Sequence, residues 1–294
     1  MQDAAPLTKS YDDELYFAIK RINKIKSIIN YYCPYEAVLM RDARLEGTVT
    51  RYCSFARYVS FLEGGLYLPN ALNFEDPWEG HVFHEVTANP TNREQLTAFV
   101  RDRKRFLYVS CWHASDHESY AMWKIYGKED AVAIHTNGQK LEALLSDVNH
   151  QHKAKPVLLT PVEYCMPIQG KLPTPNTSAV SLEDPSSKRD ADWRNGMQQL
   201  LMYKPSAYQY EQEVRIIALD SESPDFLELK RDFEDKKGLL VAINPSEFIT
   251  GVTVAPWADS AFLRAVKAVS EKFGLDADIV KQSSLFSGPV WDDA

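Results

Sequence analysis

Hydrophobic and polar positions along the chain alternate in short segments, some with the pattern of a β-strand and others with that of a helix. Short apolar runs rich in β-branched and aromatic residues predict strands. These runs are residues 49–55, 66–71, 106–113, 131–136, 156–166, 208–219, 239–243, 249–255 and 277–282. Helices are predicted over residues 56–65, 119–127, 138–148, 192–203 and 260–273. Short strands interspersed with helices indicate an α+β domain with a mixed or antiparallel sheet.

The first 47 residues have a different pattern. Residues 11–31 predict an amphipathic helix, because apolar side chains recur at helical spacing at Leu15, Ile19, Ile22, Ile25 and Ile29. We therefore expect a helical extension over residues 1–47 and a single α+β domain over residues 48–294. Within that domain, residues 167–192 are rich in Pro, Ser and Asp, which predicts a long surface loop.

The composition is that of an ordinary globular protein. Of 294 residues, 45% are hydrophobic and 25% are charged. The 15 Tyr, 13 Phe and 6 Trp are enough for both a large core and an aromatic-lined pocket. The net charge of -8 argues against a surface that binds nucleic acid by bulk electrostatics.

No segment indicates export or membrane insertion. The opening MQDAAPLTKS lacks the apolar stretch of a secretory signal, and no apolar run approaches the ~20 residues that span a bilayer. The four cysteines are scattered and form no CxxC pair, which is typical of reduced thiols rather than of a disulfide framework or a structural zinc site. We expect a cytoplasmic protein that is not bound to a membrane.

Candidate chemistry is concentrated in the segment YQYEQEVRII, residues 208–217. Read as a strand, it places Glu211, Glu213 and Arg215 on one face, because alternate side chains of a strand point the same way. The two carboxylates would then lie about 7 Å apart and repel each other. Two interpretations follow, which are a solvated face on an edge strand and a catalytic carboxylate pair.

Other polar groups are less specific. The segment NFEDPWEG holds Asp76 and Glu79 around an Asp-Pro turn. Cys111, His113 and His117 are close in sequence, but no fourth residue completes a zinc site, so no metal is predicted. The chain contains no GxGxxG, GxxxxGK[ST] or GxSxG motif, so standard dinucleotide-binding, P-loop and hydrolase sites lack support.

The order of several short motifs resembles the bacterial family called domain of unknown function 2971. The motifs are RYCSF, LYLPNALNFEDPWEG, VSCWH, YAMWKIYG and KPSAYQYEQEVR, and together they cover roughly residues 49 to 285. That family typically has a Tyr/Arg strand, an FNDPFE turn, an SFS strand, an MWxxY helix and a YExExR strand. Here the turn departs as FEDPWE and the strand as SCW. The family has no settled activity. The resemblance of this chain to the family suggests a role in toxin or anti-phage systems.

A second resemblance is to ADP-ribosyltransferases of the R-S-E type. These enzymes have an Arg on a first strand, a Ser on a second and Glu-x-Glu on a late strand. Arg51, Ser110 and the segment Glu211-Gln212-Glu213 are similar to that series, although SCW replaces the usual Ser-Thr-Ser triplet. The resemblance implies an enzyme that cleaves NAD and transfers ADP-ribose to an acceptor macromolecule that the sequence does not identify.

The same resemblance implies roles for the two glutamates. Cleavage of the nicotinamide–ribose bond builds positive charge on the sugar, in an oxocarbenium-like transition state. Glu213 would stabilise that charge through a ribose hydroxyl. Glu211, on the same predicted face, would orient or deprotonate the arriving acceptor.

Four further residues complete the hypothetical site. Arg51 would pair with the pyrophosphate, to which its planar guanidinium is suited. Trp112 or Tyr126 would stack on the nicotinamide ring. Arg215 would offset the repulsion between the two glutamates, with direct contact to the NAD cofactor as the alternative role.

Two other functions remain open from the sequence. One is a metal-dependent nuclease or phosphodiesterase, in which Asp76, Glu79, Glu211 and Glu213 hold magnesium. The other is a non-catalytic sensor or interaction module that binds a nucleotide. Release of nicotinamide from NAD separates the transferase from both.

Overall fold

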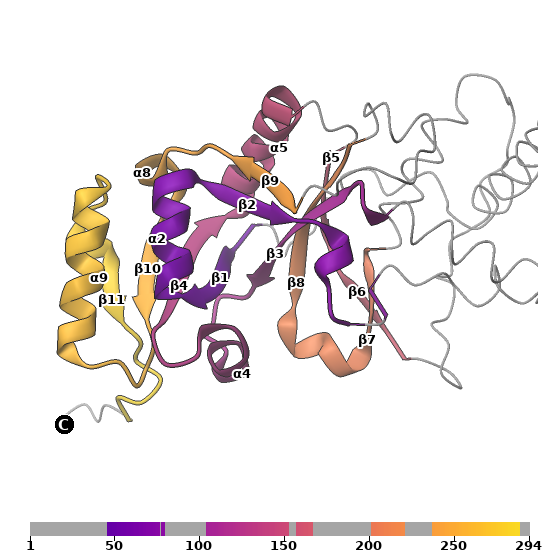
Figure 1. Ribbon diagram of the computed structural model, residues 1–294. Helices are drawn as coiled ribbons and strands as arrows, with labels where there is room; N and C mark the ends of the chain where they lie inside the picture. The colour runs from indigo at the N-terminus through magenta and orange to yellow at the C-terminus, as the bar shows by residue number, and fades with distance from the viewer. Residues whose placement is uncertain are drawn as a thin grey trace, which may run out of the picture.

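A seven-stranded mixed sheet forms the centre of the described part of the protein (Figure 1). The computed structural model describes residues 46–76, 78–79, 104–152, 157–166, 201–220 and 237–288. Residues 1–45 of the predicted extension, the predicted loop at 167–192 and most of the predicted helix at 192–203 lie outside these ranges. The strand order is β11-β10-β4-β1-β3-β8-β5. Neighbouring strands are antiparallel except β10 and β11, which are parallel.

The bounds of the elements follow the hydrophobic pattern closely. The sheet consists of β1 Thr48–Ser54, β3 Leu107–Ala114, β4 Ala131–Asn137, β5 Val157–Pro161, β8 Glu213–Leu219, β10 Gly251–Val254 and β11 Val280–Gln282. Two smaller sheets pair β2 Leu66–Pro69 with β9 Gly238–Val241, and β6 Glu163–Cys165 with β7 Tyr203–Pro205. The α-helices are α2 Phe55–Gly64, α4 Tyr120–Met122, α5 Gly138–His152, α8 Pro245–Phe248 and α9 Ser260–Lys272. The shorter helical segments are η2 Ala71–Asn73, the π-helical η3 Trp123–Gly127, η4 Ser206–Glu211 and η5 Ala277–Ile279.

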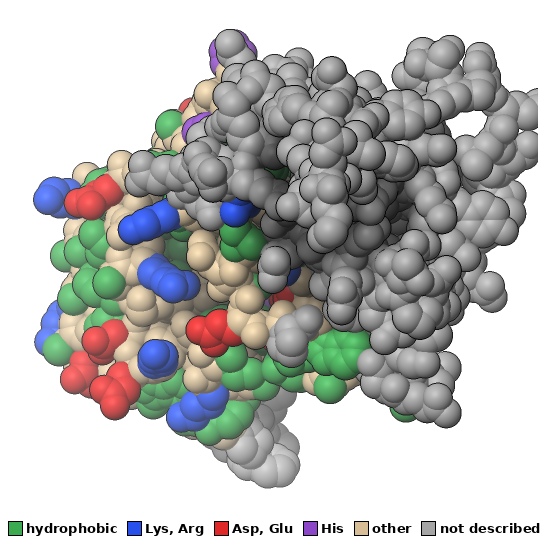
Figure 2. All heavy atoms as spheres, turned by 45° about the vertical axis from the view of Figure 1, so that its right-hand side comes forward, with side chains coloured by type: hydrophobic (Ala, Val, Ile, Leu, Met, Phe, Trp, Pro, Cys, Tyr) green, Lys and Arg blue, Asp and Glu red, His purple; other side chains and the backbone are tan. Residues whose placement is uncertain are grey.

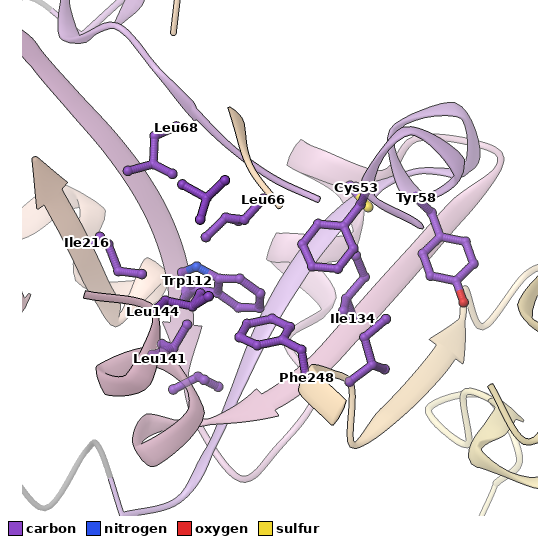
Figure 3. Close-up of a cluster of buried hydrophobic side chains, with 14 of the residues drawn as sticks. Cys53, Tyr58, Leu66, Leu68, Trp112, Ile134, Leu141, Leu144, Ile216 and Phe248 are labelled. Carbon is purple, nitrogen blue, oxygen red and sulfur yellow. The ribbon is translucent and has the colours of Figure 1, made fainter. Parts of the chain in front are cut away.

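The main core lies on one face of the large sheet. Alternate side chains of β1, β3, β4, β8 and β10 pack there against α2, α5, α8, α9 and the β2–β9 pair. Trp112 and Phe248 meet near its centre with their rings 5.8 Å apart in an edge-to-face arrangement (Figure 3). On the opposite face, Met122 and Trp123 cover Tyr52 of β1 and the two alanines of β4. Burial on both faces explains why β3 is an almost unbroken apolar run.

These elements confirm the predicted α+β fold class. The predicted strand over residues 208–219 is wrong in its first part, because Ser206–Glu211 form η4 and Gln212 adopts a left-handed conformation with φ 41°. A continuous strand from residue 204 to residue 213 would span about 30 Å. The turn instead brings Lys204 Nζ to 3.2 Å from Glu213 Oε1. The contact between Lys204 and Glu213 therefore depends on the η4 turn, which replaces the first part of the predicted strand.

The interpretation of this segment as a solvated edge is also wrong. β8 lies between β3 and β5 in the sheet. Glu211, Glu213 and Arg215 are all buried. The polar face of the segment therefore points into the protein and needs partners there.

Two observations concern membranes and nucleic acids. In the described ranges, none of the helices has the length and apolar character needed to cross a bilayer. On the face shown in Figure 2, basic and acidic side chains of the described residues are intermixed, without a continuous basic surface. The described side chains on that face form no basic surface of the kind that favours bulk electrostatic binding of nucleic acid.

Candidate active site

A cleft opens where the central sheet splits. β1 pairs with β4 through all seven of its residues, whereas it pairs with β3 only at Val49 and Thr50. β3 in turn pairs with β8 along seven residues, so the sheet divides between β1 and β3. A cleft of about 730 Å³ is lined by both strands, by side chains from residues 69–79 and by side chains from residues 204–215. This volume is within the range of small-molecule sites.

Five charged side chains form one wall of the cleft, and we refer to them as the ion cluster. They are Glu79, Lys204, Glu211, Glu213 and Arg215. Each is buried and each lines the cleft. In the described part of the chain, these residues come from three separate segments, which the fold brings together.

Arg215 organises one half of the ion cluster. Its two terminal nitrogens donate to the two carboxylate oxygens of Glu79 at 2.8 and 2.7 Å, a bidentate pair. Its Nε donates to Glu213 Oε2 at 2.5 Å, and Nη1 also donates to the Leu201 carbonyl at 2.7 Å. The sequence-based expectation that Arg215 offsets the charge of the glutamates agrees with these contacts, although Glu79 rather than Glu211 is its second carboxylate.

Lys204 organises the other half. Its ammonium lies 2.5 Å from Glu211, 3.2 Å from Glu213 and 3.4 Å from Glu79, measured to the nearest carboxylate oxygen. β7 and the η4 turn place it there, because the chain folds back between residues 204 and 213. Lys204 thus bridges the two glutamates that the sequence had paired.

The ion cluster contains one more carboxylate than cations, and this affects the two glutamates of η4 and β8 differently. Burial tends to raise the pKa of Glu213, but Arg215 and Lys204 outweigh burial and lower it to about 2. Burial and the neighbouring Glu213 raise the pKa of Glu211. Glu213 is therefore held as an anion, while Glu211 binds a proton more readily than an ordinary glutamate. Such a separation of pKa values distinguishes the acid–base roles of paired carboxylates in active sites.

Glu211→Gln is expected to remove part of the pH dependence of stability. Because the folded-state pKa of Glu211 is raised, its proton stabilises the fold at low pH, and this stabilisation is lost as the pH rises through the folded pKa. The contribution of Glu211 to the melting temperature should therefore decline as the pH rises above about 4.3, the ordinary glutamate pKa. Glutamine imitates the protonated form and cannot titrate, so the melting temperature of the variant relative to the wild type should rise over this range.

Thermal unfolding followed by circular dichroism across this pH range measures the difference. The exposed Glu271 on α9 supplies a matched control, and Glu271→Gln should follow the wild-type curve. Parallel curves for wild type and Glu211→Gln would show that Glu211 holds no extra proton in the folded state.

Tyrosines surround the two glutamates. The hydroxyl of Tyr126 donates a hydrogen bond to Glu211 Oε1 at 2.9 Å. Tyr126 is 42% exposed and lines the cleft, so its ring is accessible to a ligand there. The Glu213 backbone N–H donates to the Tyr164 hydroxyl at 2.9 Å. Of the two predicted stacking residues, Tyr126 has an exposed ring, whereas Trp112 is packed in the core.

Arg51, Ser110 and Trp112 form a second group. Arg51 Nη1 donates to Ser110 Oγ at 3.1 Å, and Trp112 Nε1 donates to the same oxygen at 3.0 Å. Their side chains share the main-core face of the sheet, whereas Glu213 and Arg215 point to the opposite face. Arg51 still lines the cleft at the split, while Ser110 is fully buried. The structure therefore unites Arg51 with Ser110, and Glu211 with Glu213, but it does not place Ser110 beside the glutamates.

Sequence reasoning missed Lys204, and it assigned Glu79 only to a possible metal site. Lys204 stands in the run LLMYKPSAY, residues 200–208, where a single charge interrupts an apolar segment. Such a lysine is rarely buried unless it is paired, so the interruption was a usable signal. The partner Glu79 lies more than a hundred residues away and has no comparable signal.

Residues 122–216 of the chain match a family model described as Protein of unknown function (DUF2971). The matched segment contains most of the YAMWKIYG motif and all of the KPSAYQYEQEVR motif. It also contains four of the five members of the ion cluster, and the fifth, Glu79, lies outside it. A search of curated proteins found no match, and neither did a search of solved structures. The family description assigns no activity, so functional inference depends on the geometry of the cleft.

Proposed function

We propose that the chain is an ADP-ribosyltransferase-like enzyme that cleaves NAD and transfers ADP-ribose to an acceptor macromolecule. One observation carries this proposal. The ion cluster places three carboxylates against two cations in the wall of an open cleft, which leaves a surplus negative charge beside the space for a ligand. NAD has a cationic nicotinamide ring, and its cleavage develops positive charge on the ribose.

The charge distribution suits each step of the reaction. The bond between the ribose C1′ and the nicotinamide nitrogen breaks, and its electron pair neutralises the pyridinium ring. Glu213, with its pKa lowered to about 2, remains an anion and stabilises the positive sugar. The acceptor then attacks C1′ with a lone pair and loses a proton. Glu211 receives that proton, since a carboxyl with a raised pKa is a more effective base near neutral pH than an ordinary glutamate.

Other residues of the cleft fit the rest of a dinucleotide. Arg51 and Arg57 both line it, and guanidinium groups bind phosphate oxygens in pairs. The hydrogen bond to Ser110 orients Arg51, which gives the buried serine a supporting role. The exposed ring of Tyr126 offers a stacking surface beside Glu211.

The magnesium-dependent nuclease has less support from the geometry. Lys204 Nζ lies within 3.4 Å of Glu79, Glu211 and Glu213, at the position where a shared metal ion would need to bind. Asp76 is not part of the ion cluster, and its Oδ1 accepts a hydrogen bond from the Trp78 backbone N–H. Among the described residues, no group of three or more His, Cys, Asp or Glu side chains is arranged to hold a metal ion.

The test is release of nicotinamide from NAD by the purified full-length chain. We expect release that persists in Glu271→Gln, an exposed control, and in the presence of a chelator. Saturable binding of NAD without release would favour the nucleotide sensor, and chelator-sensitive cleavage of a nucleic acid would favour the nuclease. Labelled NAD incubated with a cell extract would then identify the acceptor, and with it any role in toxin or anti-phage systems.

A further inference from the structure

Within the described ranges of the chain, His113 has one ring nitrogen engaged and the other without a partner. Its Nδ1 lies 2.6 Å from the Glu211 carbonyl oxygen. A carbonyl only accepts, so Nδ1 carries the hydrogen and Nε2 of the neutral ring has a free lone pair. Burial lowers the pKa of His113, which favours this neutral form. Nε2 is buried and has no hydrogen-bond partner among the described residues.

His113 also has a defined place in the cleft. It is only 3% exposed and contributes to the cleft lining. In the β3–β8 ladder it stands directly opposite Glu213, so the two side chains share one face of the sheet. The rings of Tyr52 and His113 pack in an edge-to-face arrangement with their centroids 5.8 Å apart. These contacts fix the direction of an imidazole whose remaining capacity is to accept one hydrogen bond.

We propose that His113 is a ligand-binding residue whose Nε2 accepts a hydrogen bond from a hydroxyl group of the sugar held against Glu213. A buried acceptor without a partner costs free energy, and a hydroxyl donor removes that cost. The ligand class is therefore a ribosyl compound with a free hydroxyl beside the one that contacts Glu213. This inference rests on the proposed function for the identity of the sugar.

The test is a thermodynamic cycle between His113 and the ligand hydroxyls. Carba-NAD, which cannot be cleaved, and its forms lacking the 2′ or the 3′ hydroxyl of the nicotinamide-bearing ring are titrated into wild type and His113→Phe by calorimetry. In wild type, loss of the hydroxyl bound by His113 should weaken binding about tenfold. In His113→Phe the same loss should change affinity by less than about twofold. Equal hydroxyl effects in both proteins would overturn the assignment.

His135 provides the matched control. It is a second histidine of the sheet, but both its ring nitrogens are engaged, with Thr50 Oγ1 at 2.9 Å and Thr253 Oγ1 at 2.7 Å. His135→Phe should therefore keep the wild-type effect of each hydroxyl, even if it lowers stability. A hydroxyl effect that disappears in His135→Phe as well would mean that any damage to the sheet abolishes discrimination, which would also overturn the assignment.

Nitrogen-15 NMR of the wild-type imidazoles tests the same contact without a substitution. Addition of carba-NAD should shift the unprotonated Nε2 resonance of His113 while Nδ1 stays protonated, and an unmoved Nε2 would overturn the proposal. Coupling to His113 without cleavage of NAD would keep this inference and remove the proposed function. Cleavage of NAD without that coupling would do the reverse. Failure of wild type both to bind carba-NAD and to cleave NAD would remove both.

Discussion

Glu213→Gln is expected to lower the rate of nicotinamide release by about 10²–10³-fold, the scale of losing one preorganised electrostatic group from an active site. Glutamine keeps the size of the side chain and part of its hydrogen bonding. It removes the negative charge that Lys204 and Arg215 hold in place, with the pKa lowered to about 2. The positive charge that develops on the sugar then lacks its fixed counter-charge. The measurement is single-turnover nicotinamide release, which isolates the chemical step.

Glu211→Gln is the informative comparison, because both glutamates contact Lys204. If Glu211 serves the acceptor, its loss should reduce transfer to the acceptor more than hydrolysis of NAD by water. Both variants need to be compared below their unfolding transitions, since Glu213→Gln also leaves Lys204 and Arg215 with one anion fewer. Equal hydrolysis by wild type and folded Glu213→Gln would contradict a catalytic role for Glu213.

The sequence predicted most of the fold because the described strands and helices carry clear periodic patterns. Two predicted strands, at residues 208–219 and 277–282, begin with 3₁₀-helical segments instead, and the first of these exceptions is instructive. The segment YQYEQEV alternates as a strand does, yet η4 occupies its first part and Gln212 ends the turn with a positive φ. Alternation over a few polar and aromatic residues does not separate a strand from a short 3₁₀ turn, and here the contacts of Lys204 with distant side chains favour the turn.

The candidate site was only half predictable for a similar reason. The pairing of Glu211 with Glu213 and the compensating role of Arg215 are local in sequence, and the structure keeps them together. The contact between Glu79 and Arg215 joins residues 136 positions apart, which no spacing rule reveals. The sequence also did not reveal which face of the sheet the Ser110 side chain lies on. Both faces of β3 are buried, so the apolar pattern of this strand does not distinguish the face toward the glutamates from the face toward the main core.

Arg215→Met is expected to have the largest effect on stability, a loss of about 3–5 kcal/mol in the free energy of unfolding. Arg215 is fully buried, and its guanidinium donates to Glu79, Glu213 and the Leu201 carbonyl. Methionine can replace much of its volume, but not the guanidinium that lies 5.8 Å from the Phe74 ring centroid. It cannot replace the charge, so three buried carboxylates would share the single ammonium of Lys204.

Urea unfolding at neutral pH measures this loss, with Arg264→Met as the control. Arg264 is exposed on α9 and donates only to Ser260 in the described contacts of its side chain, so its replacement should change stability by less than about 0.5 kcal/mol. Adding Glu79→Gln to Arg215→Met removes one unpaired carboxylate and should recover part of the loss, since the two residues are directly coupled. If the double variant is no more stable than the single one, the uncompensated charge is not the cause, and the role of Arg215 is its bond to Leu201 and its packing.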